Sequence, residues 1–263
     1  MTGAAGRIEI VEEAGIARVA LCNPDRRNAV SAPMWQALRD FATAAAGRSD
    51  LRAVLLSGAG DRVFSAGADI SGFEAGRSDP EQARAYDDLV EESCRALEAL
   101  EIPCIAVLQG PCVGAGASLA ACCDLRLAAE DAYLMVPAAR LGLGYDPRGV
   151  ARFLRVFGPS ATRLLLLTSA PLPASQALSM GAVHACHPKE RLGAAVAELA
   201  ERITGLAPLS LRAAKAAIIG HERGDAAALE RAEALVALAD GSCDYAEGRA
   251  AFAARRAPVF RGV

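Results

Sequence analysis

The sequence contains few aromatic residues, few histidines and little net charge. Aromatic residues make up 5% of its 263 residues, with one tryptophan, and there are three histidines. The formal net charge is −3, from 28 basic and 31 acidic side chains, so the chain as a whole has no electrostatic attraction to nucleic acid. No apolar run approaches the roughly 20 residues that span a bilayer. We therefore expect any bound anion to be small, with neither nucleic acid nor a membrane as partner.

The eight cysteines show no repeated metal-ligand spacing. Their positions are Cys22, Cys94, Cys104, Cys112, Cys122, Cys123, Cys186 and Cys243. Most lie inside apolar runs, where a free cysteine behaves as a small buried hydrophobe. The first residues lack the apolar core of a signal peptide. We expect reduced, buried thiols, no metal site and a cytoplasmic location.

Strand and helix patterns alternate along most of the chain. Hydrophobic residues make up 53% of the sequence and charged residues 22%, as in globular proteins. The predicted strands cover residues 8–21 (two strands around Ala14-Gly15), 51–57, 105–108 and 125–128. The predicted helices cover residues 32–46 (with Ser31 as cap), 80–101, 116–123, 192–203, 209–219, 226–239 and 245–256. Repeated strand, strand and helix predict an α/β protein with parallel pairing between units, and a helical region after a boundary near residue 200.

Two short segments rich in small residues each follow a predicted buried strand. They are residues 64–70 (Phe-Ser-Ala-Gly-Ala-Asp-Ile) and residues 110–118 (Gly-Pro-Cys-Val-Gly-Ala-Gly-Ala-Ser). The first N–H groups of a helix have no internal partner and lie at the positive end of its dipole. Small side chains allow a substrate to approach that backbone. Two such ends facing one point predict an oxyanion site, whereas tight strand-to-helix packing is the alternative interpretation.

Together the two segments resemble the oxyanion-hole motifs of the crotonase superfamily, the enoyl-CoA hydratase/isomerase group. The resemblance covers nearly the whole chain and implies a crotonase-like spiral of ββα units with an acyl-CoA site in residues 1–200. Residues 201–263 would form a helical C-terminal region for oligomerisation and CoA contact, in a homotrimer or a hexamer of two trimers. The matching N–H donors are Ala68 and Ala115. Coenzyme A would be part of the thioester substrate, with no tightly bound cofactor.

Other segments resemble the CoA-binding parts of the family. Residues 23–29 resemble the segment whose basic side chains meet the phosphates, with a solvated turn as the alternative. Residues 251–256 resemble the C-terminal segment whose aromatic and basic side chains reach a CoA on a neighbouring subunit. Ala66 matches the residue whose carbonyl meets the adenine. The substrate-binding positions implied by the resemblance are Arg26, Arg27, Ala29, Ala66, Asp69, Ile70, Phe252 and Arg255.

Two positions depart from the hydratase pattern. Hydratases of the family carry two glutamates that hold and activate water, and the matching residues here are Ser118 and Ala138. Serine is a poor base and alanine has no ionisable group. A positioned acid or base typically contributes about 10²–10⁴-fold to a rate, so we expect ordinary hydration to be slow.

The remaining polar candidates lie in a later loop and on the helix before the second motif. Asp146 matches a working aspartate of dienoyl-CoA isomerases and 4-chlorobenzoyl-CoA dehalogenases, and a solvated or capping role is the alternative. Tyr145 matches a tyrosine of methylmalonyl-CoA decarboxylases, although Ala68 stands where that enzyme has a histidine; loop packing is the alternative. Glu91 or Glu92 is a candidate substitute base, while their acidic run favours a solvated face.

These residues favour an acyl-CoA-processing enzyme that stabilises a thioester enolate, with isomerase- or decarboxylase-type chemistry preferred over hydration. A non-catalytic acyl-CoA-binding protein or scaffold is the alternative. A thioester hydrolase or dehalogenase with Asp146 as nucleophile is a weaker one.

Overall fold

A six-stranded sheet, mostly parallel, forms the centre of the protein. The computed structural model describes residues 6–69 and 79–263. Within them the large sheet has the order β1-β2-β3-β4-β6-β9, and a smaller sheet has the order β5-β7-β8. The strands are β1 (Arg7–Glu13), β2 (Ile16–Cys22), β3 (Ala53–Gly58), β4 (Cys104–Leu108), β5 (Cys112–Val113), β6 (Leu125–Ala129), β7 (Tyr133–Met135), β8 (Leu172–Pro173) and β9 (Ala185–His187). In the large sheet only β1 and β2 pair antiparallel.

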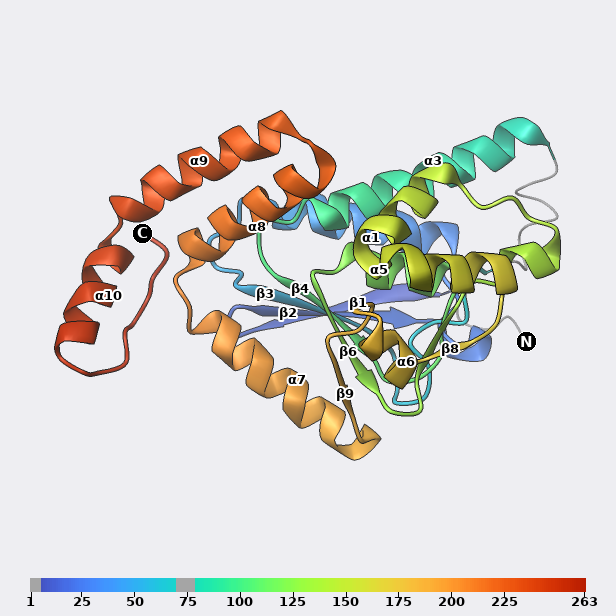
Figure 1. The fold of residues 1–263 in the computed structure, drawn as a ribbon, viewed down its shortest axis with the longest axis horizontal. Helices are drawn as coiled ribbons and strands as arrows, with labels where there is room; N and C mark the ends of the chain where they lie inside the picture. Colours follow the sequence, from blue (N-terminus) through green and yellow to red (C-terminus); the bar gives the residue numbers. More distant parts are fainter. Residues whose placement is uncertain (1–5, 70–78) are drawn as a thin grey trace.

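Helices cover the sheet and extend beyond it. They are η1 (Pro24–Arg26), α1 (Ala32–Ala45), α3 (Pro80–Glu98), α4 (Ala115–Cys122), η3 (Ala138–Leu141), α5 (Pro147–Thr168), α6 (Ala174–Ser179), α7 (Lys189–Thr204), α8 (Pro208–Arg223), α9 (Ala226–Asp240) and α10 (Cys243–Ala253). Figure 1 shows α1, α3 and α5 on one side of the large sheet and α7 on the other, with α8 to α10 leading away to the C-terminus. The predicted α/β fold with a helical C-terminal region is confirmed.

Two details differ from the sequence predictions. Ser31 precedes α1, but its side chain makes no capping hydrogen bond. Residue 200, where we placed the boundary, lies inside α7, which packs on β6 and β9. A division between the sheet-covering part and the helical extension therefore falls more naturally in the loop before α8, which begins at Pro208.

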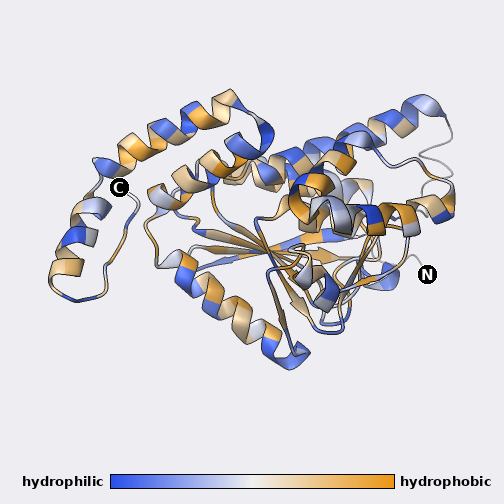
Figure 2. Ribbon diagram, viewed as in Figure 1, coloured by the Kyte–Doolittle hydropathy of each residue, from blue (hydrophilic) through white to orange (hydrophobic). Residues whose placement is uncertain are grey.

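The central strands are buried on both faces, as parallel strands covered by helices must be. Trp35, Phe64 and Phe153 are completely buried, and Figure 2 shows the hydrophobic colour running along the inner strands while α3 is largely polar. Among the described helices none alone is long and apolar enough to cross a membrane; α7 and α8 pass by length and composition only as a pair, bent by 104°.

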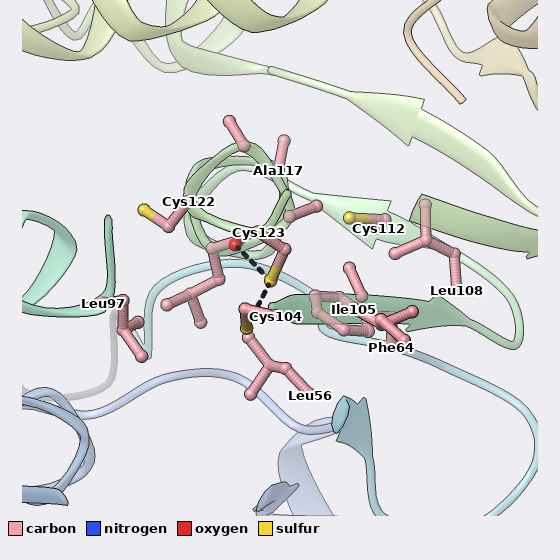
Figure 3. Close-up of a cluster of buried hydrophobic side chains, with 14 of the residues drawn as sticks. Leu56, Phe64, Leu97, Cys104, Ile105, Leu108, Cys112, Ala117, Cys122 and Cys123 are labelled. Atoms are coloured by element: carbon pink, nitrogen blue, oxygen red, sulfur yellow. Dashed lines mark hydrogen bonds between the residues drawn. The ribbon is translucent and has the colours of Figure 1, made fainter. Parts of the chain in front are cut away.

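Most of the cysteines belong to this core. All eight are free thiols, and six are buried. Figure 3 shows four of them among Leu56, Phe64 and Ile105, and the Sγ atoms of Cys104 and Cys123 lie 3.4 Å apart. Cys243 is exposed, contrary to the prediction of buried thiols, because it lies in the first turn of the outlying α10.

Candidate active site

A cavity of about 740 Å³ lies where the start of α4 meets α3, η3 and the start of α5. Its lining is largely apolar and includes charged residues of α3 and α5. Residues from both small-residue segments reach it, as do residues of the loop that precedes α5. The lining includes Ala66, Ala68, Gly114, Ala115, Ser118, Val136, Ala138, Leu141, Leu143, Tyr145, Asp146, Arg148, Glu91 and Arg152.

The two small-residue segments lie directly against each other. Ser65 forms a parallel β-bridge with Cys112. A Cβ atom at Gly114 would lie 3.7 Å from Cα of Gly67, and a Cβ atom at Gly116 would lie 2.9 Å from Cβ of Ser65. The latter approach is too close for carbon atoms, which pack at about 3.5–4.0 Å. Tight packing therefore does explain Gly116, and it also brings both segments to one cavity.

The N–H groups of Ala68 and Ala115 are available for a ligand. The backbone hydrogen bonds around Ala68 use other groups: Val30 N–H donates to Gly67 O at 2.8 Å, and Asp69 N–H donates to Val30 O at 2.9 Å. Ala115 is the first residue of α4, so its N–H has no acceptor within the helix. Neither amide has an acceptor among the described residues. Both residues line the cavity, where the helix dipole favours negative charge.

A hydroxyl pair lies beside these amides. Ser118 Oγ and the Tyr145 hydroxyl share a hydrogen bond of 2.8 Å, and both residues line the cavity. Burial raises the pKa of Tyr145 well above its usual range, and the hydrogen bond to Ser118 offsets this only in part. Tyr145 therefore stays protonated at neutral pH and is suited to donate a hydrogen bond. The contact joins residues 27 positions apart, and no local sequence signal indicated it.

Asp146 caps α5. Its carboxylate accepts hydrogen bonds from Arg148 N at 2.7 Å and from the Arg148 guanidinium at distances from 2.7 Å. The hydrogen bonds from the Arg148 side chain hold the pKa of Asp146 below its usual range, so the carboxylate is a weak base. The capping role that we kept open for Asp146 is thus present, although the residue also lines the cavity.

Ala138 begins η3 and is buried at the cavity wall.

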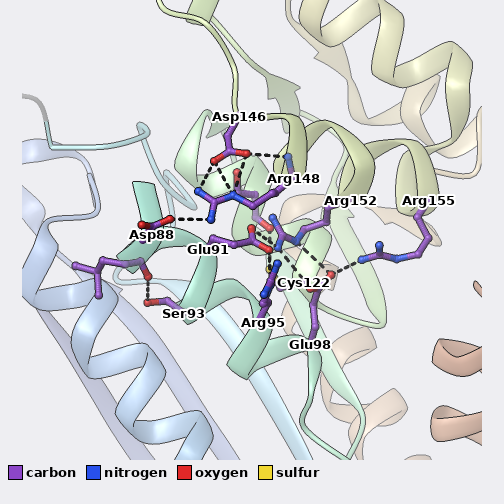
Figure 4. A network of polar contacts seen from close by, with 12 residues as sticks. Asp88, Glu91, Ser93, Arg95, Glu98, Cys122, Asp146, Arg148, Arg152 and Arg155 are labelled. Atoms are coloured by element: carbon purple, nitrogen blue, oxygen red, sulfur yellow. Dashed lines mark hydrogen bonds and ion pairs between the residues drawn. The ribbon is translucent and has the colours of Figure 1, made fainter. Parts of the chain in front are cut away.

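Glu91 and Glu92 have different surroundings. Glu91 is buried and accepts from Arg95 Nε and Arg152 Nη2, both at 2.8 Å, as Figure 4 shows. Glu92 is exposed and accepts from Arg39 at 3.0 Å. The prediction of a solvated face is confirmed for Glu92 and is wrong for Glu91, whose buried carboxylate accepts a hydrogen bond from Arg152 of α5. Glu91 lines the cavity, but both its oxygens are engaged by arginines.

The positions expected to bind CoA on this chain lie next to the cavity. Arg26 and Arg27 are exposed at the end of η1, and Ala66 N–H donates to Arg27 O at 3.0 Å. Ala66 lines the cavity, so the backbone of Arg27 contacts its wall, whereas neither arginine is among the described residues that line it. Ala29 is buried in the same turn.

Two further predicted positions contribute less to this geometry. Asp69 Oδ2 accepts from Asn23 at 3.4 Å, so its side chain ties the first motif to the turn before η1. Ile70 lies outside the described residues.

Phe252 and Arg255 are remote from the cavity in a single chain. Phe252 lies in the last turn of α10, the red helix at the far edge of the molecule in Figure 1, and Arg255 follows just after that helix. Neither lines the cavity in the described part of the chain. Phe252 is 88% exposed. Its neighbour Arg256 pairs with Glu247 and lowers the pKa of that carboxyl to about 2. In residues 6–69 and 79–263, no group of three or more His, Cys, Asp or Glu side chains could hold a metal ion.

The fold, together with a helix N-terminus that opens on an apolar cavity, defines a crotonase-type protein. Residues 11–263 match the enoyl-CoA hydratase/isomerase family model, and the chain belongs to this family. It is 35% identical over 261 residues to a probable enoyl-CoA hydratase (echA6) of Mycobacterium leprae, covering 97% of this chain and 99% of the relative. It is also 31% identical to a crotonyl-CoA hydratase of Syntrophomonas wolfei, with 96% and 97% covered.

Solved structures agree with the family match. An enoyl-CoA hydratase/carnithine racemase from Magnetospirillum magneticum superposes with a TM-score of 0.91 at 36% identity, covering 97% of this chain and 96% of that chain. An enoyl-CoA hydratase from Bacillus anthracis superposes with a TM-score of 0.88 at 27% identity, covering 98% and 100%. The chain therefore belongs to this enzyme family and has the fold that we expected. The relatives named above are called hydratases.

Proposed function

We propose that the protein acts on an acyl-CoA thioester by stabilising an enolate, or a related oxyanion, with the N–H groups of Ala68 and Ala115. The observation that carries this proposal is that both amides, each without an acceptor among the described residues, belong to one cavity. One such donor is typically worth about 2.7–4 kcal/mol of barrier. Coenzyme A enters as part of the substrate, next to Arg26 and Arg27, and the scheme needs no tightly bound cofactor.

The side chains around the amides favour isomerase- or decarboxylase-type chemistry over hydration. Ser118 and Ala138, the positions that match the hydratase glutamates, offer no carboxylate to activate water. Tyr145 supplies a protonated hydroxyl beside them. Decarboxylation needs an oxyanion hole and a pocket that orients the departing carboxylate, but no strong base. We assign the polar chemistry to Tyr145 rather than Asp146, because Arg148 engages the Asp146 carboxylate.

Proline substitution tests the amide of Ala115 directly. Proline is well tolerated at the first position of a helix and has no N–H, so Ala115→Pro deletes one donor with little change of backbone. Ala226 is the first residue of α9, far along the chain, and Ala226→Pro is the matched control. We expect Ala115→Pro to lower kcat by about 10²–10³-fold and Ala226→Pro to leave it unchanged. Equal kcat for Ala115→Pro and the parent protein would refute the proposal.

The reaction type is tested with a panel of CoA thioesters: a 2-enoyl, a 3-enoyl and a 2-carboxyacyl thioester. Turnover of the second or third at a higher rate than hydration of the first supports the proposal. Hydration of crotonyl-CoA at about 10²–10³ s⁻¹, a rate typical of efficient enzymes, contradicts it.

A second candidate is acyl-CoA binding without turnover. It is favoured by the ion pairs of two carboxylates that line the cavity: Glu91 is held by two arginines and Asp146 by Arg148. Tight binding of the panel in calorimetry with no product would establish it. The hydrolase or dehalogenase alternative requires Asp146 as nucleophile, and the absence of a covalent acyl adduct in a single turnover counts against it.

We extend the proposal to assembly and location. The exposed Phe252 of α10 and Arg255 just after it fit a role at the CoA of a neighbouring subunit, in a homotrimer or a dimer of trimers of a cytoplasmic protein. Residues 201–263 would supply these contacts. Sedimentation equilibrium distinguishes trimer and hexamer from monomer, and a monomer that binds acyl-CoA with full affinity would refute the shared site.

A further inference from the structure

The ring of Tyr145 is held from three directions. Its hydroxyl lies 2.8 Å from Ser118 Oγ. Its ring stacks on Phe153, with centroids 5.4 Å apart and 27° between the planes. A Cβ atom built at Gly149 would lie 2.9 Å from Cε1 of the ring, closer than the roughly 3.5–4.0 Å at which carbon atoms pack. The ring therefore occupies the space that any other residue at position 149 would need.

The backbone does not require glycine at this position. Gly149 lies in the first turn of α5, after the N-cap Asp146 and Pro147, and its φ is not in the left-handed region. A glycine within a helix is less favourable than alanine, because it loses more conformational freedom on folding. The absence of a side chain at Gly149 leaves room for the Tyr145 ring to pack against α5.

Phe153 completes this arrangement one turn further along α5. It is completely buried and also contacts Phe157, with ring centroids 5.1 Å apart. The Phe153 ring against which Tyr145 stacks is thus part of the close-packed core and cannot move aside easily. A methyl group at position 149 would push the ring away from α5, and its hydroxyl with it.

We propose that Gly149 is a positioning residue that, with Phe153, sets the place of the Tyr145 hydroxyl in the cavity. The inference deepens the proposed function, because it concerns the hydroxyl to which that function assigns the polar chemistry. A displacement of about 1 Å in a reacting group can cost up to roughly 10²-fold in rate. Gly149 acts through Tyr145 and needs no contact with the substrate.

The test compares two glycine-to-alanine substitutions in helices. Gly149→Ala introduces the methyl group against the ring. Gly193→Ala is the matched control, because Gly193 lies within α7 and a Cβ atom there would meet nothing within 4 Å. Crystal structures of both variants give the distance between the Tyr145 hydroxyl and Ser118 Oγ. We expect that distance to exceed hydrogen-bonding range in Gly149→Ala and to stay unchanged in Gly193→Ala; an unchanged distance in Gly149→Ala overturns the inference.

Kinetics separate positioning from a merely structural role. With whichever CoA thioester is turned over, we expect Gly149→Ala to lower kcat by about 10- to 100-fold with little change in KM. In a Tyr145→Phe background the same substitution should leave kcat unchanged, since there is no hydroxyl to misplace. An equal loss in both backgrounds overturns the inference. If no thioester is turned over, the proposed function fails, while the crystallographic distance still decides the role of Gly149.

Discussion

Arg152 is the residue whose loss should weaken the fold most among the charged groups of the cavity. Its side chain is 4% exposed and lies between two buried carboxylates. Nη2 donates to Glu91 at 2.8 Å, and Nε lies 3.2 Å from an oxygen of Glu98. Figure 4 shows the guanidinium at the centre of this cluster. The perturbation is Arg152→Met, which keeps much of the apolar stem and removes the charge.

The magnitude follows from what each carboxylate retains. Glu98 keeps ion pairs with Arg155 and Arg223. Within the described part of the chain, Glu91 keeps only Arg95, whose side chain is 65% exposed, and such a partner contributes about 0–1 kcal/mol. Removing one partner of a buried ion pair typically costs about 3–5 kcal/mol, and we expect a loss in this range for Arg152→Met.

The reverse substitution should cost less. Glu91→Gln leaves Arg152 with Glu98, and the amide oxygen can still accept a hydrogen bond from the guanidinium. We expect a loss of about 1–3 kcal/mol, the range for hydrogen bonds to charged groups. A larger loss of stability for Arg152→Met than for Glu91→Gln would show that Arg152 serves both carboxylates, Glu91 and Glu98.

Urea unfolding followed by circular dichroism measures these differences, provided that the slope with denaturant stays constant. Arg39→Met is the control, because it removes an exposed pair with Glu92 and should cost less than about 1 kcal/mol. The reasoning is refuted if Arg152→Met is no more destabilising than this control, or if Glu91→Gln costs as much as Arg152→Met.

Three further predictions concern the loop before α5 and the C-terminal helix. Tyr145→Phe leaves the buried Ser118 hydroxyl without its partner and should cost about 1–3 kcal/mol in urea unfolding, more than the pair Tyr145→Phe with Ser118→Ala. Asp146→Ala should cost about 1 kcal/mol as a lost N-cap, and Asp146→Asn much less. Because Arg148 lowers the pKa of Asp146, the charge-dependent part of this contribution, which Asp146→Asn also removes, is full above the unfolded value of 3.8 and is lost as pH falls below it. Phe252→Ala should leave the melting temperature of an isolated subunit unchanged and weaken acyl-CoA binding, measured by calorimetry.

Each of these expectations has a contrary result. Greater loss for the double variant than for Tyr145→Phe would mean that Ser118 has another partner. A stability difference between the parent protein and Asp146→Ala that is the same at neutral and acid pH would exclude the charged cap. Unchanged acyl-CoA affinity for Phe252→Ala in the assembled protein would remove α10 from the shared site.

The parts of the fold that follow from short stretches of sequence were predictable. The buried strand β4 and the small-residue helix α4 were found nearly to the residue, because their patterns are local. The long helix α5 was not predicted. Gly158 inside it has a φ of 75°, and Pro159 follows, so the helical pattern is interrupted in the middle. A proline typically kinks or ends a helix, whereas both halves of α5 carry buried residues such as Phe153 and Leu165.

The site was predictable to the same extent. The two small-residue segments indicated both amides, although only Ala115 begins a helix in the described residues, whereas Ala68 lies in an isolated β-bridge with Val30. The surroundings of Glu91 were not predictable, because its partner Arg152 is 61 residues away and the neighbouring acidic residues suggest a solvated face. The contact of Tyr145 with Ser118 likewise depends on the path of the loop before α5, which no pattern in that loop reveals.

The amides of Ala68 and Ala115 belong to the backbone, and this has a consequence for how the protein can diverge. Every amino acid except proline supplies the same N–H group, so ordinary mutation at either position cannot delete the donor. The side chains at Ser118, Ala138 and Tyr145 have no such protection. A lineage can therefore exchange a few side chains in the cavity while keeping both amides of the proposed oxyanion site, and a protein engineer can do the same.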